Sequence, residues 1–485
     1  MVRGGVNKDV FLSFLRCTKL AQYTEKFPHL NNEEIIRTFI EVNEIKFKDL
    51  AYQLICNAEK LSTSKIFRNK IFKTPAGEEV SADVILKRIH NAELNTKKET
   101  ILIEIVSSTN LKDGPEFMWL AYKLYLIKKS NYDIDKIYLI KVDSKYEKGK
   151  TNPSDFIYVK DVTNKINQFL PNIPPLLKRI KNVLLQNSLM EKQKGIYCLE
   201  PNPCFFKTNC WQDMPSENET VFEIEKMPSV TKFQLFWDEL FSFQEIPRKR
   251  LDKRQWIQVK HGMRNVPLIQ EDKIKEWLMN SNSISGTWFL DIGTCYPVEP
   301  LCINGRPFSS TPFQFSLIFQ FNGGTNYTEY DFIGLNLDSS ELVYHFIKNL
   351  NTIISKVPEA KIIVYNLNKV VTIMNNLVIM EPELKGDIMS IKNRMVDLMQ
   401  VFYECWYYLP VFKGSFKLSK IAPLMIRDQF FIEPQIRDGK IAGNIFLNSL
   451  YNKDSLSEKE VINLKEYSRY NSMSMIEITK ILRQI

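Results

Sequence analysis

Several features are scarce in this chain of 485 residues, and their scarcity excludes whole classes of protein. No run of about 20 apolar residues is present, so we expect no membrane-spanning helix. The first residues, MVRGGVNKDVF, lack the apolar stretch of a secretory signal peptide. Eight cysteines in so long a chain fit a reducing compartment, and the sequence therefore predicts a cytoplasmic protein without a membrane partner.

Sequence features of several common enzyme classes are also missing. The chain has only four histidines, and His90, His261 and His345 show no metal-ligand spacing. No glycine-rich loop of the P-loop or Rossmann type occurs, and neither Cys295 nor Cys302 has a partner that would suggest a catalytic thiol. We expect no small-molecule substrate.

What the chain does contain is enough apolar material for real cores and an excess of positive charge. Hydrophobic residues make up 44% of the sequence, and the formal net charge is +9. This length allows two or three domains. A basic chain suits a polyanionic partner such as nucleic acid, although this charge is modest for the length.

The sequence predicts α/β architecture in two regions, residues 1–215 and 286–485, joined by a linker and helical connector at 216–285. In the first region, the patterns predict helices at 39–55 and 116–130 and strands at 80–89, 100–109 and 136–146. In the second region, they predict strands at 313–321, 330–337 and 360–368 and helices at 342–357 and 389–406.

Three evenly spaced cysteines, Cys198, Cys204 and Cys210, lie near the end of the first region. Local turns could bring their thiolates onto one metal centre, and Cys17 is a candidate fourth ligand from the other end of that region. From spacing alone, an iron–sulfur cluster, a zinc ion and four reduced thiols all remain open.

The arrangement of one distant cysteine plus a C-terminal trio resembles the iron–sulfur PD-(D/E)XK nucleases of the RecB type. The resemblance implies a [4Fe–4S] cluster on these four cysteines. It also implies that Asp83, in SADVIL, and Glu104, in ILIEIVSST, hold Mg²⁺ or Mn²⁺ for phosphodiester hydrolysis. The family normally has E-x-K at the second position, but this chain has Val106 where the lysine belongs.

A lysine on the following helix offers a replacement for the missing one. The family helix carries a glutamine in a pattern like LAxQxY, and here LAYKLY places Lys123 at that position. Two neighbouring carboxylates repel each other unless a cation neutralises them. We therefore predict that Lys123 points toward Asp83 and Glu104 and takes the catalytic role. The alternative is a solvated helix residue and an inactive site.

From Trp288 onward the chain resembles a bacterial family, labelled as a domain of unknown function, which joins a RecB-like domain to a DEDD exonuclease-like domain of the RNase H-like fold. The segments that carry the resemblance include FLDIGTCYP, IIVYNLN and RMVDLMQVFYECWYYLP. Asp291 and Asp397 remain from the four carboxylates that such a site needs. Gly293 stands where an acid belongs. The resemblance therefore implies a degenerate site that binds no catalytic metal pair.

Basic residues cluster in the connector beside Trp256. They are Arg248, Lys249, Arg250, Lys253 and Arg254. Such a strip could bind phosphates while the aromatic residue stacks on a base, or it could be a solvated charged helix.

Two functional hypotheses follow from these patterns. The chain is a nucleic-acid-processing enzyme that hydrolyses phosphodiesters, with DNA favoured over RNA, or it is an inactive pseudonuclease that acts as a nucleic-acid-binding or scaffold protein.

Overall fold

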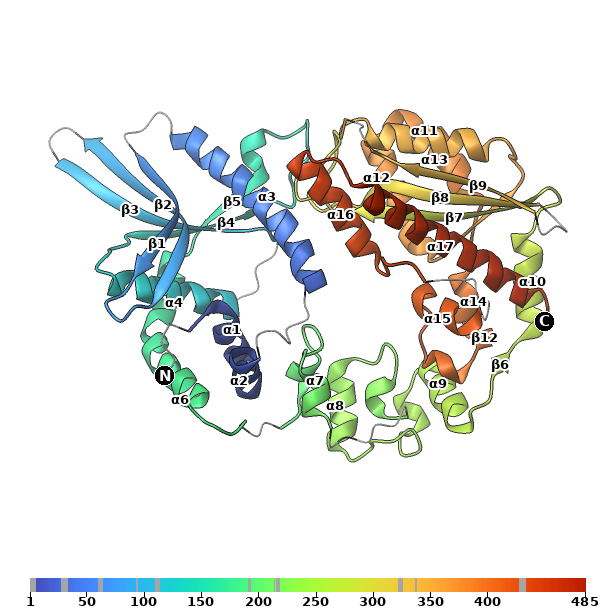
Figure 1. Ribbon diagram of the computed structural model, residues 1–485, viewed down its shortest axis with the longest axis horizontal. Coiled ribbons are helices and arrows are strands. Elements are labelled where there is room, and N and C mark those ends of the chain that lie inside the picture. The colour runs from blue at the N-terminus through green and yellow to red at the C-terminus, as the bar shows by residue number, and fades with distance from the viewer. Residues whose placement is uncertain are drawn as a thin grey trace. The chain divides into compact units, whose positions relative to one another are not determined.

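The computed structural model divides the chain into two compact units, Met1–Met214 and Pro215–Ile485, which are described separately below (Figure 1). The structure describes residues 6–27, 34–59, 64–92, 95–109, 114–190, 193–212, 214, 219–321, 326–335, 338–426 and 433–485. Part of the linker expected after residue 215 lies outside this range. Among the described helices, none is both long and apolar enough to cross a lipid bilayer.

The first unit is built on a five-stranded mixed sheet in the order β1-β2-β3-β4-β5. The strands are β1 (Lys65–Lys73), β2 (Glu79–Ala92), β3 (Asn95–Val106), β4 (Lys136–Val142) and β5 (Ile157–Asp161). The only parallel pair among these strands is β3 with β4, and α4 (Pro115–Lys129) connects the two. A helical crossover is the usual way to join parallel neighbours. The α/β class expected for this region is therefore confirmed.

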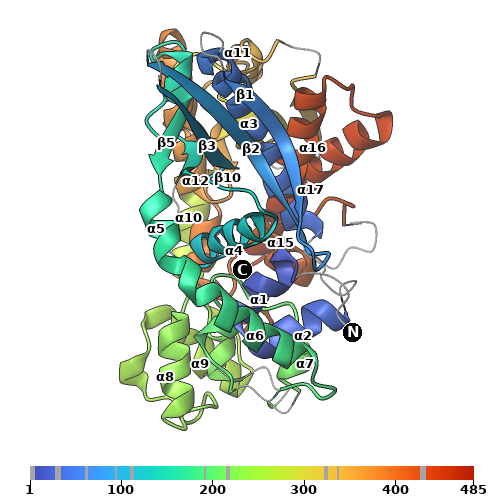
Figure 2. The ribbon, with the colours of Figure 1, turned by 90° about the vertical axis from the view of Figure 1, so that its left-hand side faces the viewer.

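The core of this unit explains where its helices lie. The apolar run of β3 is buried at Ile101 and Leu102, as expected of a strand covered on both faces. α1 (Lys8–Arg16) packs on α4 through Phe11, whose ring stacks on Tyr122 with centroids 5.1 Å apart. Figure 2 shows α4 crossing below the strands, with α1, α2 (Thr18–Lys26) and α6 (Ile173–Leu184) beneath it. α3 (Glu34–Glu59), which contains the helix expected at 39–55, contacts β3.

The second unit has its own five-stranded sheet, in the order β11-β10-β7-β8-β9. The first three strands in the sequence form the expected antiparallel meander, and they are β7 (Gly286–Cys295), β8 (Thr311–Phe321) and β9 (Tyr327–Ile333). The sheet continues with β10 (Lys361–Val364) and β11 (Met395–Asp397), each parallel to its inner neighbour.

Helices cover both faces of this sheet (Figure 1). One face carries α11 (Leu342–Ile354), α12 (Leu367–Met380) and α13 (Lys385–Lys392). The other carries α16 (Gly439–Asn452) and α17 (Glu458–Leu482), which contact β7. Polar side chains that point from the sheet toward α17 are therefore removed from water.

One helix prediction for this unit is wrong in part. The sequence predicted a single helix over residues 389–406, but α13 ends at Lys392 and Met395–Asp397 forms β11 before the short α14 (Met399–Tyr403). The helix does not continue here because the backbone of Met395 and Val396 pairs with β10. Such tertiary pairing outweighs local helix propensity.

The connector belongs to the second unit. It contains α8 (Ser229–Trp237), α9 (Lys253–Arg264), β6 (Leu268–Ile269) and α10 (Glu271–Ser281). β6 pairs with β12 (Tyr407–Tyr408), and the amide of Gln258 donates to the backbone oxygens of Glu223 and Lys413. These contacts fix the connector to the rest of the unit.

Candidate functional site

Asp83 and Glu104 lie where the strands of the first sheet separate. The pairing of β2 with β3 runs from Ala92–Asn95 only as far as Val84–Ile103, so Asp83 and Glu104 are the next positions beyond it. The backbone N–H groups released there donate to side chains instead: Ile105 N donates to Asp83 Oδ2 (2.9 Å) and Asp83 N to Glu104 Oε1 (3.4 Å). A buried N–H group needs an acceptor, and each carboxylate supplies one across the gap.

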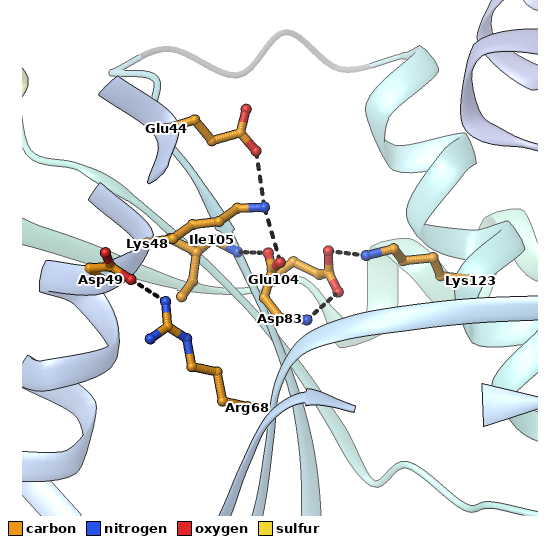
Figure 3. Close-up of polar contacts among 8 residues, drawn as sticks. All are labelled: Glu44, Lys48, Asp49, Arg68, Asp83, Glu104, Ile105 and Lys123. Carbon is orange, nitrogen blue, oxygen red and sulfur yellow. Dashed lines mark hydrogen bonds and ion pairs between the residues drawn. The ribbon is translucent and has the colours of Figure 1, made fainter. Parts of the chain in front are cut away.

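Lys123 reaches this pair from α4, as the sequence predicted. Its Nζ lies 2.5 Å from Glu104 Oε2, and the exposed fractions of the two side chains are only 10% and 12% (Figure 3). The alternative of a solvated lysine is therefore wrong. Burial raises the pKa of Glu104 above its usual value, the charge of Lys123 lowers it, and the charge of Asp83 raises it.

A second lysine was missed by sequence reasoning. Lys48, on α3, contacts Asp83 Oδ1 (3.0 Å) and Glu44 Oε1 (2.9 Å) and so links two acids (Figure 3). Burial lowers the pKa of Lys48, but the charges of Asp83 and Glu44 outweigh this and raise it overall. The Glu44–Lys48 spacing of four residues was visible in the sequence, yet it is also typical of an ordinary surface helix.

Two cavities open at this site, one on each side of Asp83. The first, of about 390 Å³, is lined by Glu104, Lys123 and Trp119 among others. The second, of about 320 Å³, is lined by Tyr52 and Arg68 among others. Val106 lines the first cavity, so the position at which the sequence resemblance implies a lysine faces the same space as Lys123.

The donor set fits a Mg²⁺ or Mn²⁺ ion held by two carboxylates. Within the described residues, no group of three or more His, Cys, Asp or Glu side chains could hold a metal ion by itself. Mg²⁺ usually keeps several water ligands and takes only one or two protein carboxylates, which is the number that Asp83 and Glu104 supply. A bound ion would compete with Lys48 and Lys123 for these oxygens.

The four predicted cysteines converge in the first unit. Cys17 lies at the junction of α1 and α2, and Cys198, Cys204 and Cys210 belong to the segment that ends with α7 (Lys207–Cys210). All four line one cavity together with Tyr23 and Phe206. The fold therefore brings Cys17 to the same cavity as the other three cysteines, although it lies far from them in the sequence.

Electrostatics and hydrogen bonds support this convergence. Burial raises the pKa of Cys210, the charge of Lys19 lowers it, and the other three thiols raise it. Arg16, next to Cys17, donates to the backbone oxygens of Tyr197 (2.7 Å) and Asn202 (2.5 Å). None of the eight cysteines, all of which lie in the described residues, forms a disulfide bond. In this structure the four thiols line one cavity without forming a group that could hold a metal ion, so cluster ligation stays a prediction.

In the second unit, Asp291 is held by protein donors. It lies in β7, and its Oδ2 accepts hydrogen bonds from Ser468 Oγ (3.0 Å) and Asn471 Nδ2 (3.3 Å) of α17. Burial raises the pKa of Asp291, and Asn471, Lys369 and Ser468 lower it.

Asp397 and Gly293 also lie in arrangements that differ from a metal site. Asp397 Oδ1 accepts from the backbone N–H groups of Asn366 (3.0 Å) and Met399 (2.9 Å), which begin α12 and α14. Gly293 faces Gln314 of β8, and a Cβ atom at Gly293 would lie 2.4 Å from Gln314 Cγ. Gln314 therefore fills the space into which a side chain at position 293 would project.

The basic strip is divided between packing and solvent. Arg254 lies over the ring of Tyr403, with its guanidinium carbon 3.9 Å from the centroid, and Arg248 lies 5.5 Å from that of Trp256. The Nη2 atom of Arg250 lies 3.7 Å from Oδ2 of Asp238. Lys249 and Lys253 are exposed. Two of the five side chains thus pack on aromatic rings, which the sequence did not predict.

The region that contains Asp291 and Asp397 is also the region that matches a family model. No curated protein matches the chain. Residues 288–417, which include both Asp291 and Asp397, match a family model described as a domain of unknown function (DUF2779), and the chain is similar to that family over this range.

Proposed function

We propose that this chain is a metal-dependent nuclease whose active site lies in the first unit. The unit would be a PD-(D/E)XK nuclease-like domain of the RecB type, and the second unit an RNase H-like domain of the DEDD exonuclease type. The observation that carries the proposal is the contact of Lys123 with Glu104, because it supplies a cation from α4 in the cavity that Val106 also lines.

The residues of the site would divide the work as follows. Asp83 and Glu104 would hold Mg²⁺ or Mn²⁺, which when bound supplies charge stabilisation of the phosphate oxygens and an activated water. The charge of Lys123 opposes the rise that burial causes in the pKa of Glu104, and its ammonium group would add a positive charge beside the phosphate. Trp119 and Leu120 line the same cavity.

A [4Fe–4S] cluster on Cys17, Cys198, Cys204 and Cys210 belongs to this proposal. It would join the start of the first unit to its end, at the junction that Arg16 already bridges by hydrogen bonds. Four thiolates facing one cavity would repel one another, and cluster iron would neutralise them.

The experiment is a cleavage assay on full-length protein purified without oxygen. Single- and double-stranded DNA and RNA are offered with Mg²⁺ or Mn²⁺, and EDTA serves as the metal-free control. We expect cleavage that requires the metal and is lost in Asp83→Asn. If the unmutated protein cleaves none of these substrates with either metal, the enzyme proposal is wrong.

A second candidate function is a non-catalytic nucleic-acid-binding or scaffold role, and it applies best to the second unit. The observation that favours it is the use of Asp291 by Ser468 and Asn471 as a buried hydrogen-bond acceptor. If the single substitution Asp83→Asn abolishes cleavage while the second unit is intact, all of the chemistry belongs to the first unit.

A further inference from the structure

Asp83 separates two cavities rather than closing one. Asp83, Lys48 and Ile105 line both the cavity that contains Glu104 and Lys123 and the cavity that contains Tyr52 and Arg68. Figure 3 shows Lys123 and Arg68 approaching from different sides, with Asp83 and Lys48 between them. The proposed function uses only the first cavity, so the second has no role in it.

The backbone opens on this second side as well. The pairing of β1 with β2 skips Asn69, the residue opposite Asp83, and Asn69 has a left-handed φ of 51°. A non-glycine residue in this region is uncommon and interrupts regular strand geometry. Asp83 therefore lies where β2 loses its regular partners on both sides, and the second cavity occupies the opening toward β1.

We propose that the second cavity is a binding subsite for the nucleotide next to the cleaved phosphate; this rests on the proposed function. Lys48 and Arg68 would bind the phosphate of that nucleotide, and Tyr52 would stack on its base. The ligand is a nucleic-acid strand with an unpaired base, because only an unstacked base can lie against an aromatic ring.

The side chains of this cavity have the chemistry that the subsite needs. The guanidinium carbon of Arg68 lies 4.9 Å from the centroid of the Tyr52 ring. Arginine and tyrosine both present flat faces to bases, and a guanidinium group matches the geometry of a phosphate. Lys48 also lines this cavity, and its ammonium group, which contacts Asp83, is a second cation there.

The present partner of Arg68 does not prevent phosphate binding. Arg68 pairs with Asp49, and the two side chains are 40% and 47% exposed. An ion pair this exposed contributes little, because water screens it and two flexible side chains must be ordered. A phosphate with two charged oxygens can therefore replace Asp49 as the partner of Arg68.

The test measures binding separately from cleavage. Fluorescence anisotropy follows a labelled single-stranded oligonucleotide of about ten nucleotides with the full chain in EDTA, with DNA and RNA of one sequence as separate arms. Arg68→Ala and Tyr52→Leu should each weaken binding about tenfold. Arg68→Ala should also reduce the slope of log K against log salt by about 0.7, as expected for one lost phosphate contact. The arm with the higher affinity identifies the nucleic acid.

A matched control lies on the same strand. Lys73 is exposed and paired with Glu79, as Arg68 is with Asp49, but it does not line the cavity. Lys73→Ala should change affinity less than about twofold, which is the range expected of a surface charge outside the contact. Equal weakening by Arg68→Ala and Lys73→Ala would overturn the subsite. Tyr52→Phe should retain affinity, and if Tyr52→Leu does not fold, Arg68→Ala against Arg68→Lys decides.

The outcomes also separate this inference from the proposed function. Binding that depends on Arg68 and Tyr52 without any cleavage in Mg²⁺ would support the subsite and reject the nuclease. Cleavage that is indifferent to both residues would reject the subsite and support the nuclease. Absence of oligonucleotide binding by the unmutated chain would overturn the subsite.

Discussion

Both units of this chain place two carboxylates on strands of a five-stranded sheet, and the partners of these carboxylates differ. Asp83 and Glu104 contact the ammonium groups of Lys48 and Lys123 and face open cavities. Asp291 instead accepts from a hydroxyl and an amide, and Asp397 from backbone N–H groups. A metal ion or a substrate could compete with lysine ammonium groups beside a cavity, whereas the donors to Asp291 and Asp397 are hydroxyl, amide and backbone groups held by packing.

The comparison shows that two candidate sites with incomplete motifs can differ in the space around the substituted position. In each candidate site one residue departs from the motif that the sequence resemblance implies, Val106 in the first and Gly293 in the second. Around Val106 the space stays open and Lys123 supplies a charge. Around Gly293 the side chain of Gln314 fills the space. When a residue expected from a motif is absent, the space that its side chain would occupy should therefore be examined as well.

The largest expected effect is on cleavage by the first unit. Lys123→Met should lower the rate of metal-dependent cleavage at least about a hundredfold, because it removes a positioned cation from the reacting phosphate. The matched control is Lys128→Met, since Lys128 lies on the same helix but is exposed. If Lys123→Met binds and folds normally and its cleavage rate is unchanged, Lys123 has no catalytic role and does not distinguish the first site from the second.

Loss of a cysteine should affect the first unit only. Cys17→Ala should abolish the brown colour and iron content of anaerobically purified protein and lower the unfolding midpoint of that unit by on the order of 10 °C. Cys56→Ala is the control, because Cys56 lies in the same unit and does not line the cysteine cavity. Retained iron in Cys17→Ala would show that Cys17 is not a ligand.

Restoring an acid in the second unit should cost stability without giving activity. Gly293→Glu should destabilise the chain by about 1–3 kcal/mol, because the new side chain overlaps Gln314 in a packed region. Gly386→Glu is the control, since no atom lies within 4 Å of a Cβ atom built there. Thermal unfolding measures both variants. Exonuclease activity gained by Gly293→Glu would mean that the second site is closer to function than its packing indicates.

The smallest effect concerns the pH dependence of stability. Burial holds the pKa of Asp291 above its usual value, so the folded state binds the proton more tightly than the unfolded state does. This contribution is fully present below the unfolded pKa and is lost as pH rises through the folded pKa. The unmutated chain should therefore gain stability relative to Asp291→Asn as pH falls through this window, measured by thermal unfolding. A gain in the opposite direction would show that Ser468 and Asn471 dominate over burial.

The order of elements and the identity of the candidate residues could be predicted from the sequence. Continuous apolar runs and helical periodicity depend on neighbours in the chain, so β3, α4, β8 and β9 overlap the ranges where they were expected. Asp83, Glu104 and the four cysteines could be named because each lies in a recognisable local pattern. The strand β11 could not, because its pairing partner β10 lies about 30 residues earlier in the sequence.

What only the tertiary structure decided is which charges meet. Lys48 and Arg68 lie in unremarkable helix and strand patterns, and nothing nearby in the sequence distinguishes them from solvated residues. Folding brings Lys48 to Asp83 and Arg68 to the ring of Tyr52. It likewise turns Asp291 toward α17, about 180 residues later in the chain. Local sequence fixes the type of each side chain and its element, but the partner of a charge depends on packing between distant segments, because electrostatic and hydrogen-bond energies depend on distance in space.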